Sequence, residues 1–193
     1  MSDDGDIRDT AFGLQAGFGF AGRVATAVVG FFGSIFLARA LGPSDYGLFY
    51  VALGVANFFQ NPVNGWATAC KKRLTEPDFA IEEALGSLLV AVGALAVVGA
   101  PVGYLVVDAI TANPVLPLAV PALFVPLATY QAFTTLLSGR ANFALSEWAL
   151  VVETVFEKLA QVAFVALGFG IWGMVGGAAA GALLVVPVVY RWL

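Results

Sequence analysis

The sequence predicts an all-α membrane protein, a polytopic bundle of transmembrane helices. The first observation is composition: 60% of the residues are hydrophobic, only 11% are charged, and the mean hydropathy is +0.90. Soluble domains are about half apolar and about a quarter charged. The second is that apolar stretches recur at the ~20-residue length that one membrane-spanning helix needs. Together they indicate an integral membrane protein in contact with membrane lipid.

The same composition excludes several classes of function. The single cysteine, Cys70, rules out an internal disulfide framework, and the absence of histidine removes the commonest metal ligand and general base. We therefore expect no metal and no cofactor. A net charge of −4 without a long basic patch argues against nucleic-acid binding. No span carries paired aspartates, so an intramembrane enzyme is not expected.

Charges and Gly/Pro punctuation divide the chain into an acidic, polar cytoplasmic tail and a six-span lobe. The tail, residues 1–11, has neither the positive start nor the apolar core of a secretory signal. The lobe covers residues 12–193, and its predicted spans are about 12–41, 46–70, 84–107, 115–137, 147–168 and 172–193.

The division between the last two spans rests on length. No charge occurs between Leu159 and Tyr190, a stretch of ~48 Å as a helix, whereas one span needs ~30 Å. The glycines of "GFGIWG" suit a turn, so the fifth helix must extend back through Lys158, Glu157 and Glu153. The alternative has five spans, with residues 147–158 as an interfacial helix before one long tilted span.

Lysine and arginine near the span ends predict the orientation. Lys71, Lys72 and Arg73 follow the second span, Arg140 follows the fourth, and Arg191 closes the sixth. On the opposite side only Arg39 is near the membrane. Because short cytoplasmic loops are enriched in Lys and Arg, both termini are predicted to be cytoplasmic.

The segment "FLARALGPSDYGLFYVALGV" between the first two spans reads as a tight external turn, in which Gly42-Pro43 stops one helix and Ser44 or Asp45 caps the next. It also resembles the signature "LAR-x-LGP-x-x-YG-x-F" of polysaccharide-biosynthesis, or oligosaccharide-flippase, membrane proteins, in the multidrug/oligosaccharidyl-lipid/polysaccharide exporter superfamily. "GWATACKKRLTE" and "LLSGRANF" are similar to later family segments, and the acidic tail looks haloarchaeal. The matching residues of the signature are Leu37, Ala38, Arg39, Leu41, Gly42, Pro43, Tyr46, Gly47 and Phe49.

The resemblance implies a cytoplasmic-membrane flippase that moves lipid-linked oligosaccharide or polysaccharide precursors by alternating access. Family members have two six-helix lobes, so the chain resembles the N-terminal lobe, and a second lobe or a homodimer partner is expected. A cation-coupled multidrug-type efflux protein of the same superfamily and a non-transporting membrane scaffold are the alternatives.

The fifth span carries charge where lipid would make charge costly. At 100° per residue, Glu153, Glu157 and Gln161 share an ~80° arc, and Lys158 lies ~100° from Glu157. This stripe is predicted to line a cavity that contacts a polar head group or a coupling cation. The alternative is that Glu157 and Lys158 snorkel to the membrane boundary.

Two further sets of polar residues are candidates for the substrate pathway. Arg23 in the first span is predicted either to snorkel or to bind a phosphate. The amides of the second span follow helical spacing on one face and suit either sugar hydroxyls or hydrogen bonds between helices. These amides are Asn57, Gln60, Asn61 and Asn64.

The glycines of the sixth span are spaced for close packing of helices. Gly173, Gly177 and Gly181 form two G-x-x-x-G pairs, a spacing that allows two helix backbones to approach closely.

Overall fold

The structure, a computed structural model, describes residues 3–74, 80–111, 116–139 and 143–193. These residues form five α-helices and one short 3₁₀ turn. The helices are α1 (Asp3–Arg73), α2 (Ile81–Ile110), α3 (Ala119–Gly139), α4 (Phe143–Ala166) and α5 (Gly170–Trp192), with the 3₁₀ turn η1 (Leu116–Leu118) before α3. The all-α prediction is confirmed.

The prediction of six separate spans is wrong for the part of the chain that the structure describes. Four helical stretches there are long and apolar enough to cross a membrane, and the first of them, Gly19–Arg73, holds most of the first predicted span and all of the second. α4 is not among the four, because Glu147, Glu153, Glu157 and Lys158 interrupt its apolar character. These four stretches support a multi-span membrane protein.

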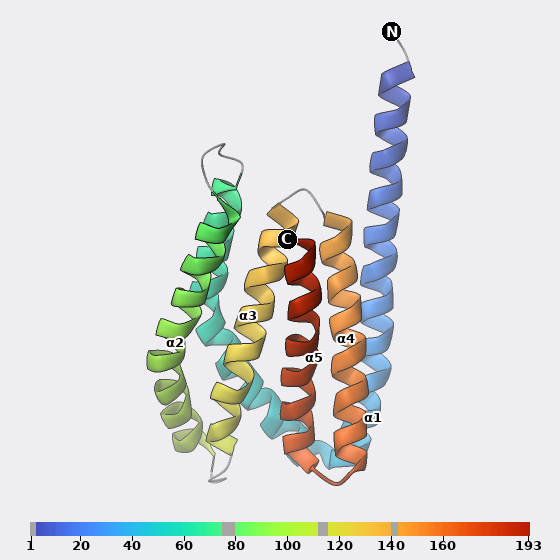
Figure 1. The fold of residues 1–193 in the computed structure, drawn as a ribbon. Helices are drawn as coiled ribbons and strands as arrows, with labels where there is room; N and C mark the ends of the chain where they lie inside the picture. Colours follow the sequence, from blue (N-terminus) through green and yellow to red (C-terminus); the bar gives the residue numbers. More distant parts are fainter. Residues whose placement is uncertain (1–2, 75–79, 112–115, 140–142) are drawn as a thin grey trace.

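The label α1 covers two helical arms, residues 3–41 and 43–73, that meet at a kink at Gly42. Gly42 alone leaves helical geometry, with φ 79° and ψ 164°. Helical geometry resumes at Pro43. Proline is well suited to the first position of a helix, because a backbone N–H there would have no partner within the helix. No new helix begins at the predicted caps, Ser44 and Asp45. The two arms of α1 therefore run along different sides of the bundle and meet at the bend (Figure 1).

Replacing Gly42 with alanine is expected to lower the free energy of unfolding in detergent by about 2 kcal/mol. The observed φ and ψ lie in a region that is essentially restricted to glycine. Thermal unfolding of Gly47→Ala provides the matched control, since Gly47 is helical and nothing lies within 4 Å of an added Cβ. Equal unfolding temperatures for the two variants would contradict the strain at Gly42.

The remaining helices match the predicted spans within a few residues. α3 packs against every other helix and is buried on most of its surface, so it is the centre of the bundle (Figure 1). Gly99 and Gly103 bring α2 close to Phe59 of the second α1 arm, and Gly103 also meets Val120.

The break between α4 and α5 confirms the predicted turn and excludes the five-span alternative with one long last span. α4 ends at Ala166 and α5 begins at Gly170. Gly168 and Gly170 adopt positive φ values of 89° and 56°, which favour glycine. The C-terminal end of α5 lies at the same end of the bundle as the start of the first α1 arm (Figure 1). Their cytoplasmic side remains a prediction.

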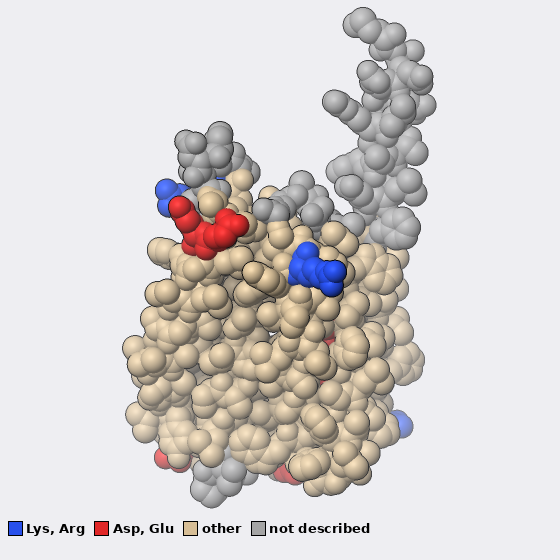
Figure 2. Space-filling model, in the orientation of Figure 1, with Lys and Arg blue, Asp and Glu red and all other residues tan. Residues whose placement is uncertain are grey.

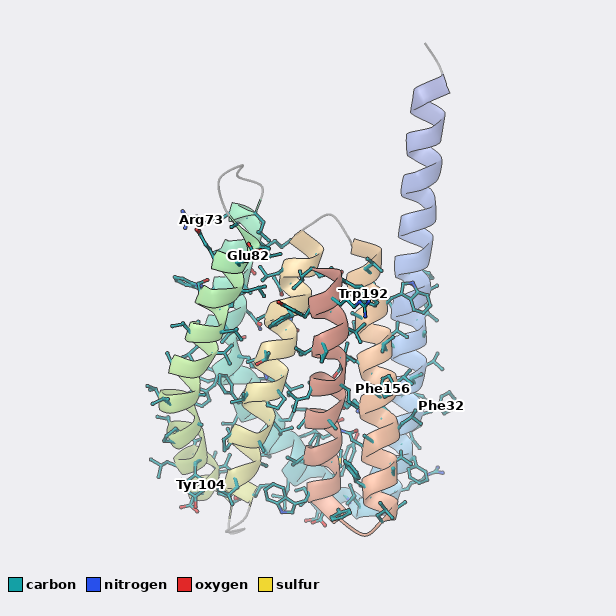
Figure 3. The ribbon with its side chains drawn as sticks, viewed as in Figure 1. Phe32, Arg73, Glu82, Tyr104, Phe156 and Trp192 are labelled. Carbon is teal, nitrogen blue, oxygen red and sulfur yellow. The ribbon has the colours of Figure 1, made fainter. Side chains whose placement is uncertain are left out.

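The outer surface suits lipid. Figure 2 shows that the charged side chains on the face in view gather at the two ends of the bundle, with a nearly uncharged belt between them. Large apolar side chains such as Phe32 and Phe156 project outward from this belt (Figure 3). α1 begins at Asp3, so residues 3–11 of the predicted tail are helical. Arg140, used above for orientation, lies outside the described residues.

Candidate functional site

The polar stripe of the fifth predicted span lies inside the bundle. Glu153 is 5% exposed and Gln161 is fully buried. The side chains of Glu157 and Lys158 are only 20% and 14% exposed, and both residues lie near the middle of α4 rather than at its ends. This position does not fit the alternative in which the two charges snorkel to a membrane boundary.

Lys158 is held by a short network on its own helix. Its ammonium group donates to Glu157 Oε1 at 2.7 Å and to Gln161 Oε1 at 3.0 Å, and Gln161 Nε2 donates to the carbonyl of Met174 on α5 at 3.2 Å. The lysine stem lies against Gly33 of α1, where an added Cβ would meet Lys158 Cδ at 3.0 Å. The network thus ties α1, α4 and α5 together around one buried ion pair.

One residue from another helix, Tyr130 of α3, completes what we call the central polar cluster: Tyr130, Glu153, Glu157, Lys158 and Gln161. Tyr130 of α3 lies within electrostatic reach of both glutamates, and Glu153 lies within reach of Glu157 and Lys158. With two carboxylates and one ammonium group, the ionised cluster has a formal net charge of −1. A proton or a small cation could neutralise that charge. No group of three or more potential metal ligands occurs in the described part of the chain.

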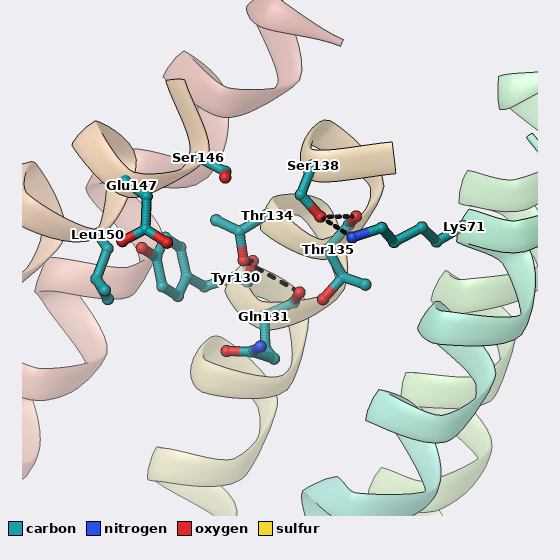
Figure 4. A pocket seen from close by; sticks show the side chains of 9 residues that line it. All are labelled: Lys71, Tyr130, Gln131, Thr134, Thr135, Ser138, Ser146, Glu147 and Leu150. Atoms are coloured by element: carbon teal, nitrogen blue, oxygen red, sulfur yellow. Dashed lines mark hydrogen bonds between the residues drawn. The ribbon is translucent and has the colours of Figure 1, made fainter. Parts of the chain in front are cut away.

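A polar cavity of about 240 Å³ opens between the second α1 arm, α3 and α4. Eight of its nine lining residues are polar, whereas apolar side chains dominate the lining of two other cavities among the described residues. Figure 4 shows Lys71 entering from one side, and Glu147 and Leu150 on the opposite wall. The lining residues are Lys71, Tyr130, Gln131, Thr134, Thr135, Ser138, Ser146, Glu147 and Leu150.

Sequence reasoning missed this cavity. A signal was present in "YQAFTTLLSG", where Tyr130, Thr134 and Ser138 recur at i, i+4 and i+8 on one helix face. The opposing residues, Lys71 and Glu147, come from distant parts of the sequence, and nothing in the local pattern pairs them with α3.

Arg23 forms an ion pair with Glu147. Its Nε and Nη2 donate to the two carboxylate oxygens of Glu147 at 3.1 and 3.0 Å, a bidentate pair between α1 and α4. The Arg23 side chain is 65% exposed while that of Glu147 is 11% exposed. The arginine therefore neutralises a buried carboxylate at the wall of the polar cavity, and its predicted phosphate role stays a prediction.

The amides of the second predicted span differ in exposure along the second α1 arm. Asn57 and Asn61 are exposed, and Gln60 is 6% exposed and donates to Asn57 Oδ1 at 3.1 Å. Asn64 Oδ1 is buried and has no hydrogen-bond partner in the part of the chain that the structure describes. Asn57 and Asn61 therefore point out of this bundle, while the substrate role of all four remains a prediction.

The signature segment forms the bend of α1. Leu37 and Phe49 are buried on either side of Gly42 and belong to the main apolar core. Arg39 and Gly47 are exposed, and the Tyr46 hydroxyl donates to that of Tyr50 at 3.1 Å. Leu37, Gly42 and Phe49 of the signature therefore shape the bend and its packing.

No family model, no curated protein and no solved structure matches the chain. The family resemblance of the signature segment therefore rests on the sequence motif alone. Together the four apolar helical stretches and the buried polar interior support a multi-span membrane protein.

Proposed function

We propose that this chain is a transporter lobe that moves lipid-linked oligosaccharide or polysaccharide precursors across the cytoplasmic membrane. One observation carries the transport proposal: the central polar cluster is buried in a bundle whose outer surface is apolar. Ionisable groups at membrane depth are costly and mark substrate or ion pathways by default. The substrate class comes from the resemblance of residues 37–49 to flippases.

A cation-coupled efflux protein is the second candidate, and Glu153 favours it. This carboxylate is 5% exposed and faces Glu157, while the nearby ammonium of Lys158 bonds Glu157 and Gln161. A buried carboxylate without its own counter-ion can bind and release a proton or a small cation. In this reading Glu153 couples ion movement to export of an organic substrate.

Flipping of a labelled polyprenyl-linked glycan by protein purified from native membranes and reconstituted in liposomes tests the proposal. We expect Glu153→Gln to lower the flipping rate about tenfold or more, because a hydrogen bond to a charged group contributes about 1.5–3 kcal/mol. Glu82→Gln is the matched control, since Glu82 is exposed in the first turn of α2. Thermal unfolding of each variant checks that equal amounts of folded protein are compared.

The outcomes separate the candidates. Loss of flipping in Glu153→Gln, with flipping retained in Glu82→Gln, supports the flippase proposal. Unchanged flipping together with lost efflux of a cationic dye supports the cation-coupled alternative. If neither activity is detected in the unsubstituted protein, or if both persist in Glu153→Gln, the cluster is structural and the transport proposal is wrong.

A further inference from the structure

The polar cavity has the chemistry of a ligand site at both of its ends. At one end Lys71 Nζ donates to Ser138 Oγ at 2.8 Å, and the Ser138 hydroxyl donates a hydrogen bond to the carbonyl of Thr135 at 2.7 Å. Since an ammonium group has three protons, this bond leaves donor capacity directed at the cavity. The lysine stem is positioned by Gly139, where an added Cβ would meet Lys71 Cγ at 3.0 Å.

The opposite end holds a hydroxyl group that lacks a partner. Tyr130 is 5% exposed and lines the cavity, and its buried hydroxyl oxygen has no hydrogen-bond partner among the described residues. Such an orphaned group is costly, and a native structure keeps few of them. Figure 4 shows the Tyr130 ring directed toward the wall that carries Glu147. Both Glu147 oxygens bond Arg23, and each carboxylate oxygen has room for a further donor.

These two ends select one ligand chemistry. A phosphate group suits the cationic end at Lys71 and Ser138, because the charge near it is positive. A ligand hydroxyl suits the other end, since it can accept from the Tyr130 phenol and donate to Glu147 at the same time. A cavity of about 240 Å³ is smaller than typical drug-sized pockets of roughly 300–1,000 Å³, so the occupant is of head-group size.

We propose that this cavity binds a small phosphorylated polyol, with its phosphate at Lys71 and Ser138 and a hydroxyl between Tyr130 and Glu147. The same chemistry occurs in a free polyol phosphate and in a phosphatidylglycerol head group. The site shares Tyr130 with the central polar cluster, but Lys71, Ser138 and Glu147 lie outside that cluster. The proposal does not require that the chain transports anything.

Calorimetric titration of the purified protein in detergent, with glycerol phosphate and with inorganic phosphate, tests the two ends separately. Lys71→Gln is expected to weaken binding of both compounds about tenfold or more, because it removes a charged donor. Tyr130→Phe is expected to weaken glycerol phosphate about fivefold and leave inorganic phosphate unchanged. Because Tyr130→Phe deletes an unpartnered buried hydroxyl, its unfolding temperature should not fall.

Lys72→Gln is the matched control, because it removes the same charge one residue along the helix and does not line the cavity. Native mass spectrometry from nanodiscs of phosphatidylglycerol or phosphatidylcholine identifies the source. Retained phosphatidylglycerol without soluble binding assigns a lipid head group, and binding of glycerol phosphate assigns a free metabolite. The proposal is overturned if neither binds, or if Lys71→Gln and Tyr130→Phe behave like Lys72→Gln.

Discussion

Replacing Lys158 with methionine is expected to lower the free energy of unfolding in detergent by about 3–4 kcal/mol. Breaking a buried ion pair by removing one partner leaves the other charge uncompensated, which typically costs about 3–5 kcal/mol. Here Lys158 is the cation that faces both Glu157 and Glu153 in the bundle interior. Methionine keeps most of the stem that packs on Gly33. The loss of stability therefore reflects the removed charge and not a new cavity.

The double variant Glu157→Gln with Lys158→Met separates charge from packing. Replacing both members of a buried pair by neutral residues of similar volume is often close to neutral. We therefore expect the double variant to recover about half of the loss seen in Lys158→Met, because Glu153 stays buried without the nearby ammonium group. Chemical or thermal unfolding in the same detergent measures all three proteins.

Lys72→Met is the control for loss of a positive charge at the surface, since Lys72 is exposed in the last turn of α1. Its expected effect is within about 0.5 kcal/mol. If Lys158→Met matches this control, the ion pair does not stabilise the bundle. If the double variant is as unstable as Lys158→Met, the loss does not come from the Glu157 carboxylate and belongs to the Gln161 network or to Glu153.

The partner of Lys158 illustrates what the sequence could and could not predict. Helical spacing correctly placed Glu153, Glu157 and Gln161 on one buried face, because lipid excludes such a stripe. It did not predict that Lys158 would turn back to Glu157 and Gln161 on its own helix. Which partner a side chain contacts depends on its rotamer, and the rotamer depends on packing, here against Gly33 of α1. The sequence of α4 alone cannot predict that contact.

The bend in α1 shows a different limit. The Gly42-Pro43 dipeptide marked the right position for a change of direction. Proline after glycine usually reads as the end of a helix, and the sequence therefore predicted two spans joined by a turn. In the structure the break in helical geometry is confined to Gly42, so the two arms are two helical segments joined by a kink rather than by a loop.

The polar cavity could not be predicted from the sequence for a third reason. Its residues come from the end of α1, the second half of α3 and the start of α4. Hydroxyl residues inside an apolar helix are unremarkable taken singly, since they commonly bond their own backbone, as Thr134 does to Tyr130. Only the packing of three helices makes them face one another.

The glycines of α5 lead to the second large effect: Gly177→Ala is expected to destabilise the protein by about 3 kcal/mol. An added Cβ would lie 2.5 Å from the backbone nitrogen and 2.6 Å from the Cα of Gln161 on α4. Backbone atoms cannot rotate away as a side chain can, so α4 and α5 must move apart. Overpacking of this kind costs about 1–3 kcal/mol and occasionally more. Unfolding in detergent measures the loss.

Gly93→Ala is the matched control, because Gly93 is an exposed helical glycine of α2 with nothing within 4 Å of an added Cβ. There alanine is expected to be neutral or to stabilise by up to about 1 kcal/mol, since it reduces the freedom of the unfolded chain. Equal stability of the two variants would mean that α4 and α5 are not in backbone contact at Gly177.

The effect of Gly177→Ala should also spread beyond the contact itself. Gln161, the residue against which Gly177 packs, donates to the Met174 carbonyl and accepts from Lys158. Moving α5 away from α4 breaks the first of these bonds and loosens the second. Combining Gly177→Ala with Lys158→Met should therefore cost less than the sum of the two single losses, by more than the roughly 0.5 kcal/mol within which independent sites add. Simple additivity would show that the glycine contact and the buried ion pair stabilise the bundle independently.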